Sequence, residues 1–283
     1  MISDAFAQYV SPHIVKELIA HPEKLTLGGE RRNITLMFTD LAGFTAMSET
    51  REPEEVAALL NRHFTLMTRT IIDHGGTIDK FIVDAIMAFW GAPLDDDDQA
   101  IHVCEAAIQM QRHIDTLNEE LLEDGLPTIS MRIGIHAGIA VVGNLGSVDR
   151  FDYTAIGDNV NMTARLEGIN KLYGTGILIS EPTDQALPDT PSRVPIDMVK
   201  FKGKTQPLCI FTFEENPVFR QQLEAAVKAF RQLNWNKAEK LWKQLKETDK
   251  YRELSMEYLR RIQNFRQTTL PDDWDGAEAL EKM

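Results

Sequence analysis

Apolar and polar positions alternate with two different periods along the middle of the chain. Short apolar runs bounded by Gly, Pro or Asp are typical of β-strands, and longer stretches with apolar residues three and four positions apart are typical of amphipathic helices. The expected strands cover 34–39, 129–136, 175–180 and 206–213, with a strand pair within 77–91 and a hairpin within 138–154. The expected helices cover 53–74 and 98–121, and another begins near 158. The turn of the 138–154 hairpin is expected at Gly143–Gly146.

Strands and helices alternate in this region, but hairpins interrupt the alternation. The pattern therefore predicts an α/β (α+β) sandwich, in which helices flank a mixed, largely antiparallel sheet. No GxGxxG sequence follows a strand and no Walker lysine is present, so the pattern does not indicate a doubly wound nucleotide-binding fold.

Two flanking segments differ from this middle region of residues 31–216. Residues 1–30 form a short amphipathic arm, in which Ser11-Pro12 starts a helix and Gly28-Gly29 ends the segment. This arm is either a packing element or a linker to an upstream domain. Residues 217–283 carry three helical apolar stripes and resemble tetratricopeptide-type hairpins, although too few for a true array. We expect them to form a C-terminal helical appendage.

The composition excludes some partners and locations. A net charge of −13 argues against nucleic acid, because phosphate contacts require clustered Lys and Arg. No apolar run approaches the roughly 20 residues that cross a bilayer, and the N-terminus is no signal peptide. We therefore expect a cytoplasmic protein, or the cytosolic part of a membrane-anchored one. Cys104 and Cys209 are expected to be buried thiols in a reducing compartment.

Asp40 ends the first apolar run and is followed by Gly43 and Thr45. A carboxylate at a strand end, a tight turn with backbone N–H groups and a hydroxyl together suit a metal-bound polyphosphate. An aspartate at this place can equally cap the following helix, and this segment alone leaves both interpretations open.

Lys80 and Asp84 are two charges within the predicted strand pair. Their even separation places them on one face of a strand, where a buried charge needs a partner or a metal ion. Four residues of strand span about 13 Å, which is too far for a direct pair along one strand. We expect the two side chains to serve different ends of a site, with a solvent-facing ion pair as the alternative.

Asn161 and Arg165 lie four positions apart near the start of the helix after Gly157, so they share one face. This placement suits a developing phosphoryl charge, although such pairs are also common on helix surfaces. Three lysines at 200, 202 and 204 precede the last apolar strand. They form either a polyphosphate-binding cluster or a solvated basic loop.

In this order and spacing, the segments resemble a class III nucleotidyl cyclase catalytic domain, and most closely the bacterial subtype with Tyr-Thr-Ala-Ile-Gly-Asp. The similar segments are FTDLAGFT, DKFIVDAIMAFWG, MRIGIHAGIAVVGN, FDYTAIGDNVNMTARLE and the lysine cluster. The similarity covers most of residues 31–216 and implies a ferredoxin-like cyclase core. Residues 6–30 and the Trp274-Asp-Gly end are also similar to segments that flank this domain in bacterial members with an N-terminal sensor.

The resemblance implies a metal and phosphate site. Asp40 and Asp84 match the two aspartates that hold two Mg²⁺ or Mn²⁺ ions, and the Leu41 carbonyl is an expected further ligand. Lys202 best matches a phosphate-binding lysine, with Lys204 as a near alternative. The terminal phosphates are expected at the backbone amides of Ala42, Gly43, Phe44 and Thr45.

The resemblance also implies a substrate and a shared site. Lys80 and Thr154 match the base-selecting pair, Asn161 the residue that orients the ribose, and Arg165 the residue that stabilises the transition state. Because a lysine and a hydroxyl suit the N1/6-amino edge of adenine, ATP is the expected substrate. In this family the site lies at a head-to-tail homodimer interface, where one protomer supplies the aspartates and the other supplies these four residues.

The implied activity is an adenylate cyclase that converts ATP to 3′,5′-cyclic AMP and pyrophosphate. The alternatives are a catalytically weak nucleotide-binding signalling dimer, a purine cyclase that also accepts GTP, and an interaction module built on the C-terminal helices. Val83 stands where the family usually has Gly, and its side chain is expected to crowd the metal strand or shift Asp84. Relatives with Thr at the base-selecting position respond to bicarbonate, so a bicarbonate response is a further hypothesis.

Overall fold

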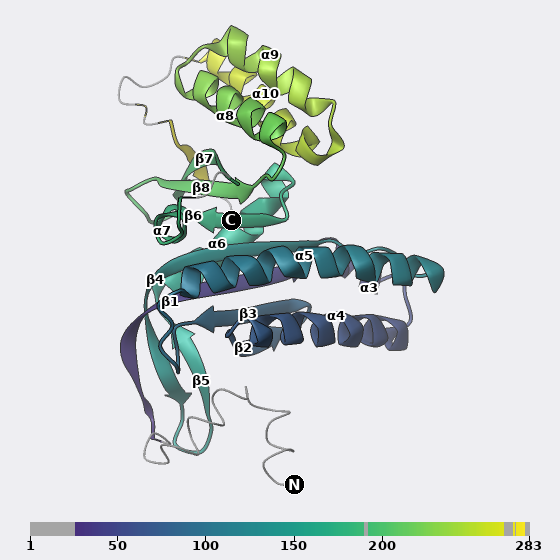
Figure 1. Ribbon diagram of the computed structural model, residues 1–283, viewed down its shortest axis with the longest axis vertical. Coiled ribbons are helices and arrows are strands. Elements are labelled where there is room, and N and C mark those ends of the chain that lie inside the picture. Colours follow the sequence, from purple (N-terminus) through teal and green to yellow (C-terminus); the bar gives the residue numbers. More distant parts are fainter. Residues whose placement is uncertain (1–25, 190–191, 269–273, 275, 281–283) are drawn as a thin grey trace. The chain divides into compact units, whose positions relative to one another are not determined.

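The computed structural model describes residues 26–189, 192–268, 274 and 276–280 (Figure 1). The chain forms two compact units, which divide between Glu167 and Gly168. The predicted N-terminal helix after Ser11-Pro12 lies outside the described residues.

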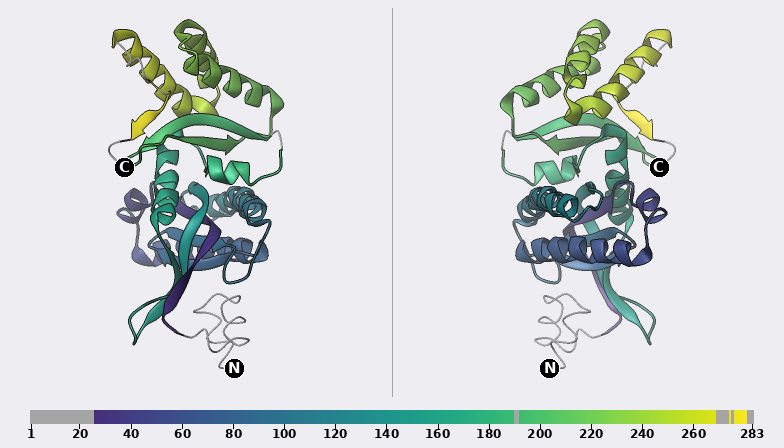
Figure 2. Two further views of the ribbon diagram at one scale, coloured as in Figure 1. Left: turned by 90° about the vertical axis from the view of Figure 1, so that its left-hand side faces the viewer. Right: turned by 90° about the vertical axis from the view of Figure 1, so that its right-hand side faces the viewer.

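The first unit is built on an antiparallel sheet. Its strand order is β2–β3–β1–β4, and β5 pairs with the far end of β4. The strands are β1 (Gly28–Leu41), β2 (Thr77–Ile82), β3 (Ala85–Trp90), β4 (Met131–Gly146) and β5 (Phe151–Ile156). The helices are α3 (Phe44–Ser48), α4 (Pro53–Asp73), α5 (Gln99–Glu123) and α6 (Asp158–Tyr173), which begins in this unit. The long helices α4 and α5 lie side by side along the sheet (Figures 1 and 2).

Local sequence explains the limits of α4. Pro53 occupies its first turn, where a missing N–H costs nothing, and Glu54 and Glu55 complement the positive end of the helix. The helix ends at Asp73, and Gly75, two residues beyond, has φ of 76°, which favours a residue without a Cβ. The predicted helices 53–74 and 98–121 are therefore confirmed within two residues at each end.

The core of this sheet follows the two-residue period of its strands. Ile34 and Leu36 of β1 are fully buried, and Leu36 lies opposite Phe89 of β3. Together with Val142 of β4 they form one apolar cluster, which fixes the register because a one-residue slip would turn these side chains to the other face.

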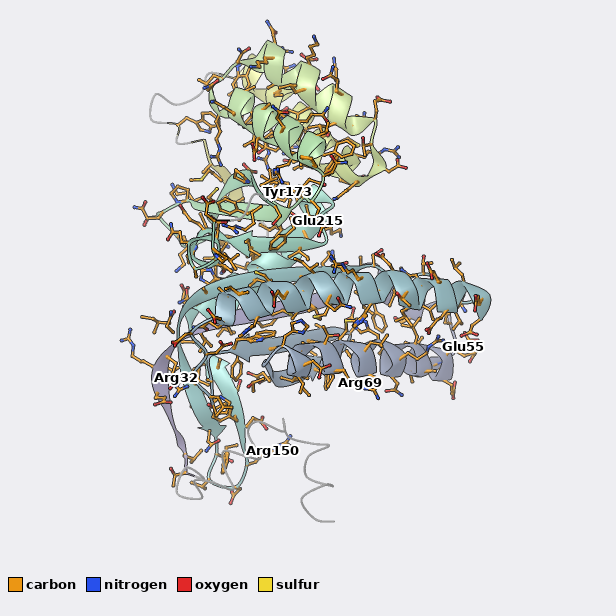
Figure 3. All side chains as sticks on the ribbon, viewed as in Figure 1. Arg32, Glu55, Arg69, Arg150, Tyr173 and Glu215 are labelled. Carbon is orange, nitrogen blue, oxygen red and sulfur yellow. The ribbon has the colours of Figure 1, made fainter. Side chains whose placement is uncertain are left out.

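The predicted turn at Gly143–Gly146 is wrong. β4 continues to Gly146, and the chain turns at Ser147–Arg150, at the tip of the arm that Figure 3 marks with Arg150. Gly143 instead lies opposite Gly29 of β1, and a Cβ on Gly143 would stand 2.2 Å from the Gly28 carbonyl oxygen. These glycines allow close strand pairing, so Gly28-Gly29 begins β1 rather than ending an N-terminal segment.

The second unit combines a smaller sheet with three helices. Its strand order is β6–β8–β7–β9, antiparallel except for the parallel pair β7–β9. The elements are β6 (Ile177–Ser180), α7 (Glu181–Gln185), β7 (Arg193–Phe201), β8 (Leu208–Phe213), α8 (Pro217–Arg231), α9 (Trp235–Lys246), the 3₁₀ turn η2 (Asp249–Tyr251), α10 (Arg252–Gln267) and β9 (Glu278–Leu280). Helices α8, α9 and α10 carry the three predicted apolar stripes, but the expectation that residues 217–283 are helical only is wrong, because β9 pairs with β7. Strand β7 was not predicted because Pro195 and Asp197 interrupt its apolar pattern.

The predicted fold class, helices flanking a mixed and largely antiparallel sheet, is confirmed. Within the part of the chain that the structure describes, no helix is both long and apolar enough to span a bilayer.

Candidate active site

Two carboxylates meet where β1 and the β2–β3 hairpin end. Asp40 is the penultimate residue of β1, and Asp84 lies in the hairpin turn, where its Oδ2 accepts a hydrogen bond of 3.3 Å from the Leu41 N–H. Burial raises the pKa of Asp84, and the neighbouring charge of Asp40 raises it further. Two anions at one strand end form a site of negative potential that favours a cation.

The structure corrects the predicted placement of Asp84. β2 ends at Ile82, so Lys80 and Asp84 do not lie on one strand and the even-spacing argument does not apply. The hairpin turn directs Asp84 to the end of β1, whereas Lys80 remains in β2.

Val83 occupies the same turn with φ of 59°, a left-handed conformation that β-branched residues rarely adopt. Two-residue hairpin turns favour glycine at this place. The Val83 side chain is 74 % exposed, so it does not crowd the metal strand as expected from the sequence. The consequence of valine here is backbone strain immediately before Asp84.

An arginine and a glutamate flank the carboxylate pair. Arg132 of β4 lies opposite Asp40 in the strand register, and its guanidinium donates a short hydrogen bond to Asp40 Oδ2. On its other side, Arg132 Nε lies 3.4 Å from Glu167 Oε1 of α6. Burial raises the pKa of Glu167 to about 7, and Asp40 adds to the rise while Arg132 opposes it. Negative charge therefore exceeds what one arginine compensates.

A second cluster forms where β2 meets β5. A β-bulge at Asp79 interrupts the pairing of β2 with β3, and the fully buried Asp79 carboxylate contacts β5. Its Oδ2 accepts hydrogen bonds from the Thr154 hydroxyl at 2.5 Å and from the Ala155 N–H at 3.2 Å. Lys80 Nζ lies 3.2 Å from Asp79 Oδ1. One carboxylate thus joins Lys80 and Thr154, the two predicted base-selecting residues.

Asn161 and Arg165 lie on α6, as predicted. Asn161 is exposed and Arg165 is half-buried. The start of the helix is held by Asn159, whose Oδ1 accepts from His136 Nε2 at 3.0 Å and whose Nδ2 donates to the Ile139 carbonyl at 2.8 Å. These bonds hold the first turn of α6, which carries Asn161, and Arg165 follows about one turn later on the same face.

The predicted phosphate-binding turn begins a short helix. Gly43 adopts φ of 76° and precedes α3, whose Phe44 is buried while Thr45 is exposed. The Ala42 N–H donates to the Ser130 carbonyl at 2.8 Å, so this amide already has a partner within the protein. A phosphate at this turn would rely on the amides that follow Ala42.

The two lysines proposed for phosphate belong to the second unit. Lys202 lies in the turn that follows β7, where Gly203 has φ of 82°, and Lys204 N–H donates to the Phe201 carbonyl at 2.9 Å. Lys202 is exposed and Lys204 is half-buried. Lys200, the first of the cluster, lies within β7 rather than in a loop.

The residues present fit a divalent cation that is shared with a ligand. Among the described residues, no group of three or more His, Cys, Asp or Glu side chains could by itself hold a metal ion. Asp40 and Asp84 supply hard carboxylate oxygens, and the pKa of Asp84 is raised first by burial and then by the Asp40 charge, a repulsion that a cation would relieve. Mg²⁺ commonly binds through one or two carboxylates, with substrate phosphates completing its shell.

The fold thus carries a carboxylate site and a separate polar site. Residues 29–214 match the family described as the adenylate and guanylate cyclase catalytic domain. The chain belongs to this family.

Several relatives are similar over most of this chain. It is 40 % identical over 209 residues to "Adenylate cyclase 1" of Rhizobium meliloti, and 39 % identical over 217 residues to "Adenylate cyclase" of Anabaena cylindrica. These matches cover 73 % and 74 % of this chain, but only 31 % and 42 % of the relatives.

Solved structures share the fold. The guanylyl cyclase Cya2 is 37 % identical with a TM-score of 0.61, and the match covers 68 % of this chain and 98 % of that one. The adenylyl cyclase CyaB from P. aeruginosa is 33 % identical with a TM-score of 0.63, and the match covers 67 % of this chain and 97 % of that one. The predicted family is confirmed, whereas these two structures differ in the nucleotide that their names give.

Sequence reasoning missed three residues of these clusters: Asp79, Arg132 and Glu167. Strict strand alternation places Asp79 on the opposite face from Lys80, and only the bulge brings both to one point. The register Asp40 to Arg132 depends on pairing between strands that are 92 positions apart. A charge next to another charge in an otherwise apolar strand was the one available signal for Asp79.

Proposed function

We propose that this chain is an adenylate cyclase domain that converts ATP to 3′,5′-cyclic AMP and pyrophosphate. The supporting observation is the meeting of Asp40 and Asp84 at the Leu41 amide, separate from the cluster of Lys80, Asp79 and Thr154. The first arrangement suits metal-bound phosphates and the second suits the polar edge of a base. The curated relatives named adenylate cyclase support the same reaction.

In the proposed reaction, the ribose O3′ attacks the α-phosphorus and forms the ring ester. The bond from the α-phosphorus to the bridging oxygen breaks, pyrophosphate leaves, and the 3′-hydroxyl proton passes to solvent. Asp40 and Asp84, with the Leu41 carbonyl, would hold two Mg²⁺ or Mn²⁺ ions, which when bound acidify the hydroxyl and offset phosphate charge. Arg165 counters the charge that grows on the α-phosphoryl oxygens, and Asn161 orients the ribose.

Lys80 and Thr154 would select the base, and the amides of Gly43, Phe44 and Thr45 would bind the terminal phosphates. Lys202 is the proposed phosphate-binding lysine, with Lys204 as the alternative. The proposed active form is a homodimer with two equivalent sites, in which the aspartates of one protomer face the Asn161 and Arg165 of the other. This arrangement explains why the Asp40–Asp84 carboxylates and the group of Lys80, Asp79 and Thr154 lie apart within one chain.

The direct test is cyclic AMP formation from ATP with Mg²⁺ or Mn²⁺ in wild type and Asp84→Ala. We expect the variant to lose at least about a thousandfold in kcat, because it removes a group needed to neutralise transition-state charge. Asp97→Ala is the matched control, since Asp97 is an exposed aspartate in the loop before α5. Wild type that forms no cyclic AMP with Mn²⁺ would refute the proposed activity.

GTP is a second candidate substrate, because the guanylyl cyclase Cya2 is as similar to this chain as the adenylyl cyclase CyaB. Competition between ATP and GTP at equal concentration separates the two. We expect cyclic AMP to be the main product, and an excess of cyclic GMP would reverse the assignment.

A further inference from the structure

Asp79 is a buried acid for which neither the fold nor the metal cluster has an evident use. Its side chain is fully buried, although it lies on a strand whose next residues are exposed. A buried carboxylate is costly unless hydrogen bonds or charges compensate it, and a bulge that presents one is a feature rather than a defect. The partners of Asp79 therefore show what it does.

Besides Thr154, two groups beside the Asp79 carboxylate can only present hydrogens to it. The Ala155 N–H is a donor only, and so is the Lys80 ammonium group beside Oδ1. Burial raises the pKa of Asp79, and Thr154, Lys80 and the Ala155 amide oppose this rise without reversing it, so the ionised form depends on these donors. A proton on Oδ1 would point at an ammonium group, and a proton on Oδ2 would compete with the Ala155 N–H and the Thr154 hydroxyl for that oxygen. The carboxylate is therefore the form that this geometry accommodates.

An ionised Asp79 fixes the direction of the Thr154 hydroxyl. A carboxylate accepts hydrogen bonds and cannot donate them, so in the 2.5 Å contact the Thr154 O–H is the donor. A hydroxyl has one proton and two lone pairs. Once that proton is committed to Asp79, Thr154 Oγ1 can act toward a ligand only as an acceptor.

We propose that Asp79 is a specificity-determining positioning residue, which makes Thr154 an obligate acceptor and thereby favours adenine over guanine. The 6-amino group of adenine donates to such an acceptor, whereas the 6-carbonyl of guanine meets it with another lone pair. Asp79 also holds Lys80 beside Thr154, so that an ammonium donor faces the unprotonated N1 of adenine rather than the N1–H of guanine. This inference rests on the proposed function, because it assumes that Lys80 and Thr154 face the base.

The test compares the ATP/GTP preference of wild type, Asp79→Ala and Asp79→Leu. Leu has the branched shape of Asp without an acceptor, and Ala leaves a cavity, so the two variants remove the acceptor with different effects on packing. Folding of each variant is checked by its thermal unfolding. In the variant that folds, we expect the ratio of kcat/KM for ATP to that for GTP to fall about tenfold, because the Thr154 proton becomes free to bond the guanine carbonyl.

Thr154→Val supplies the coupling control. It removes the hydroxyl and should lower the ratio by a similar factor, and adding the Asp79 substitution to it should change the ratio little further. A ratio within twofold of wild type in the Asp79 variant would overturn the proposal, even if activity fell equally with both nucleotides. An Asp79 effect that is undiminished in the Thr154→Val background would overturn the route through Thr154.

Binding of 3′-deoxy-ATP and 3′-deoxy-GTP, which lack the attacking hydroxyl, separates this inference from the proposed activity. Wild type that prefers the adenine analogue, with the preference lost in the Asp79 variant, supports the inference whether or not cyclic AMP is formed. Wild type that binds both analogues equally would overturn it.

Discussion

Two glutamates beside arginines, one in each unit, have opposite properties. Burial raises the pKa of Glu167 to about 7, and its contact with Arg132 is 3.4 Å long. Burial also acts to raise the pKa of Glu257, yet Arg260 and Arg261, at 2.6 and 2.7 Å, hold its net pKa below the ordinary value. The difference lies in the number and closeness of the arginines, since both side chains are mostly shielded from water.

The surroundings explain what each cluster is for. Arg261 is buried among Asp197, Glu257 and the hydroxyl of Tyr173, which Figure 3 labels, and it connects β7, α6 and α10. In this group each carboxylate is paired with an arginine, so the group stabilises the fold and fixes how its elements pack. The cluster of Asp40, Asp84 and Glu167 has an excess of negative charge, which costs stability and is typical of a site that binds a cation.

The largest expected effect is the loss of activity when the proposed active site is disrupted, and its partial recovery when two different variants form a dimer. Asp40→Ala and Arg165→Ala should each abolish cyclic AMP formation, since each removes one half of the proposed shared site. After mixing and reassociation, half of the dimers carry one intact site of two, so about a quarter of wild-type activity should return. Mixing Asp40→Ala with Asp84→Ala is the control, because both changes affect the same half. Recovery there, or none in the first mixture, would refute the shared site.

Substitutions in the cluster around Arg261 should lower the free energy of unfolding rather than the catalytic rate. Arg261→Ala leaves Asp197 buried without its cation and should lower the free energy of unfolding by about 3–5 kcal/mol. Arg260→Ala, at the neighbouring and half-exposed position, should cost less than about 1 kcal/mol. Urea unfolding of both variants measures the contrast, and equal losses would contradict the assigned difference.

The two glutamates should give opposite pH dependences of stability. Because the folded-state pKa of Glu167 lies above its ordinary value of 4.5, stability is lost as pH rises from there through about 7. Without metal ions, wild type should lose about 3 kcal/mol more than Glu167→Gln between pH 5 and pH 8. Glu257→Gln should not alter this slope, since its lowered pKa acts only at more acidic pH. Parallel curves for wild type and Glu167→Gln would contradict the prediction.

The smallest effect concerns the turn that carries Asp84. Val83→Gly should relieve the left-handed strain and raise the free energy of unfolding by about 1 kcal/mol. Leu233→Gly is the matched control, because Leu233 has φ of 57° between α8 and α9. Both changes should raise the melting temperature, whereas only Val83→Gly should change kcat. An unchanged kcat in Val83→Gly would show that the strain does not reach Asp84.

The parts of the fold that sequence predicted are those with strong local signals. Helix α4 has Pro53 at its start and Gly75 just beyond its end, and the stripes of α8 to α10 are regular, so propensity and packing agree there. Strand β7 was missed because it contains a buried charge, Asp197, whose compensating partner Arg261 lies 64 positions away in the sequence. The β4–β5 turn was misplaced because the sequence does not distinguish a glycine that allows two strands to approach closely from a glycine that forms a turn.

For the site, sequence by itself determined which side chains are available: an acid at a strand end, a second acid near Lys80, a threonine in a hairpin, and an asparagine and an arginine on one helix face. Tertiary structure decided how they group. The β-bulge turned Asp79 onto Thr154, the hairpin turn separated Asp84 from Lys80, and strand register brought Arg132 to Asp40. Such groupings depend on pairing between distant segments, and residue patterns within one segment carry no record of them.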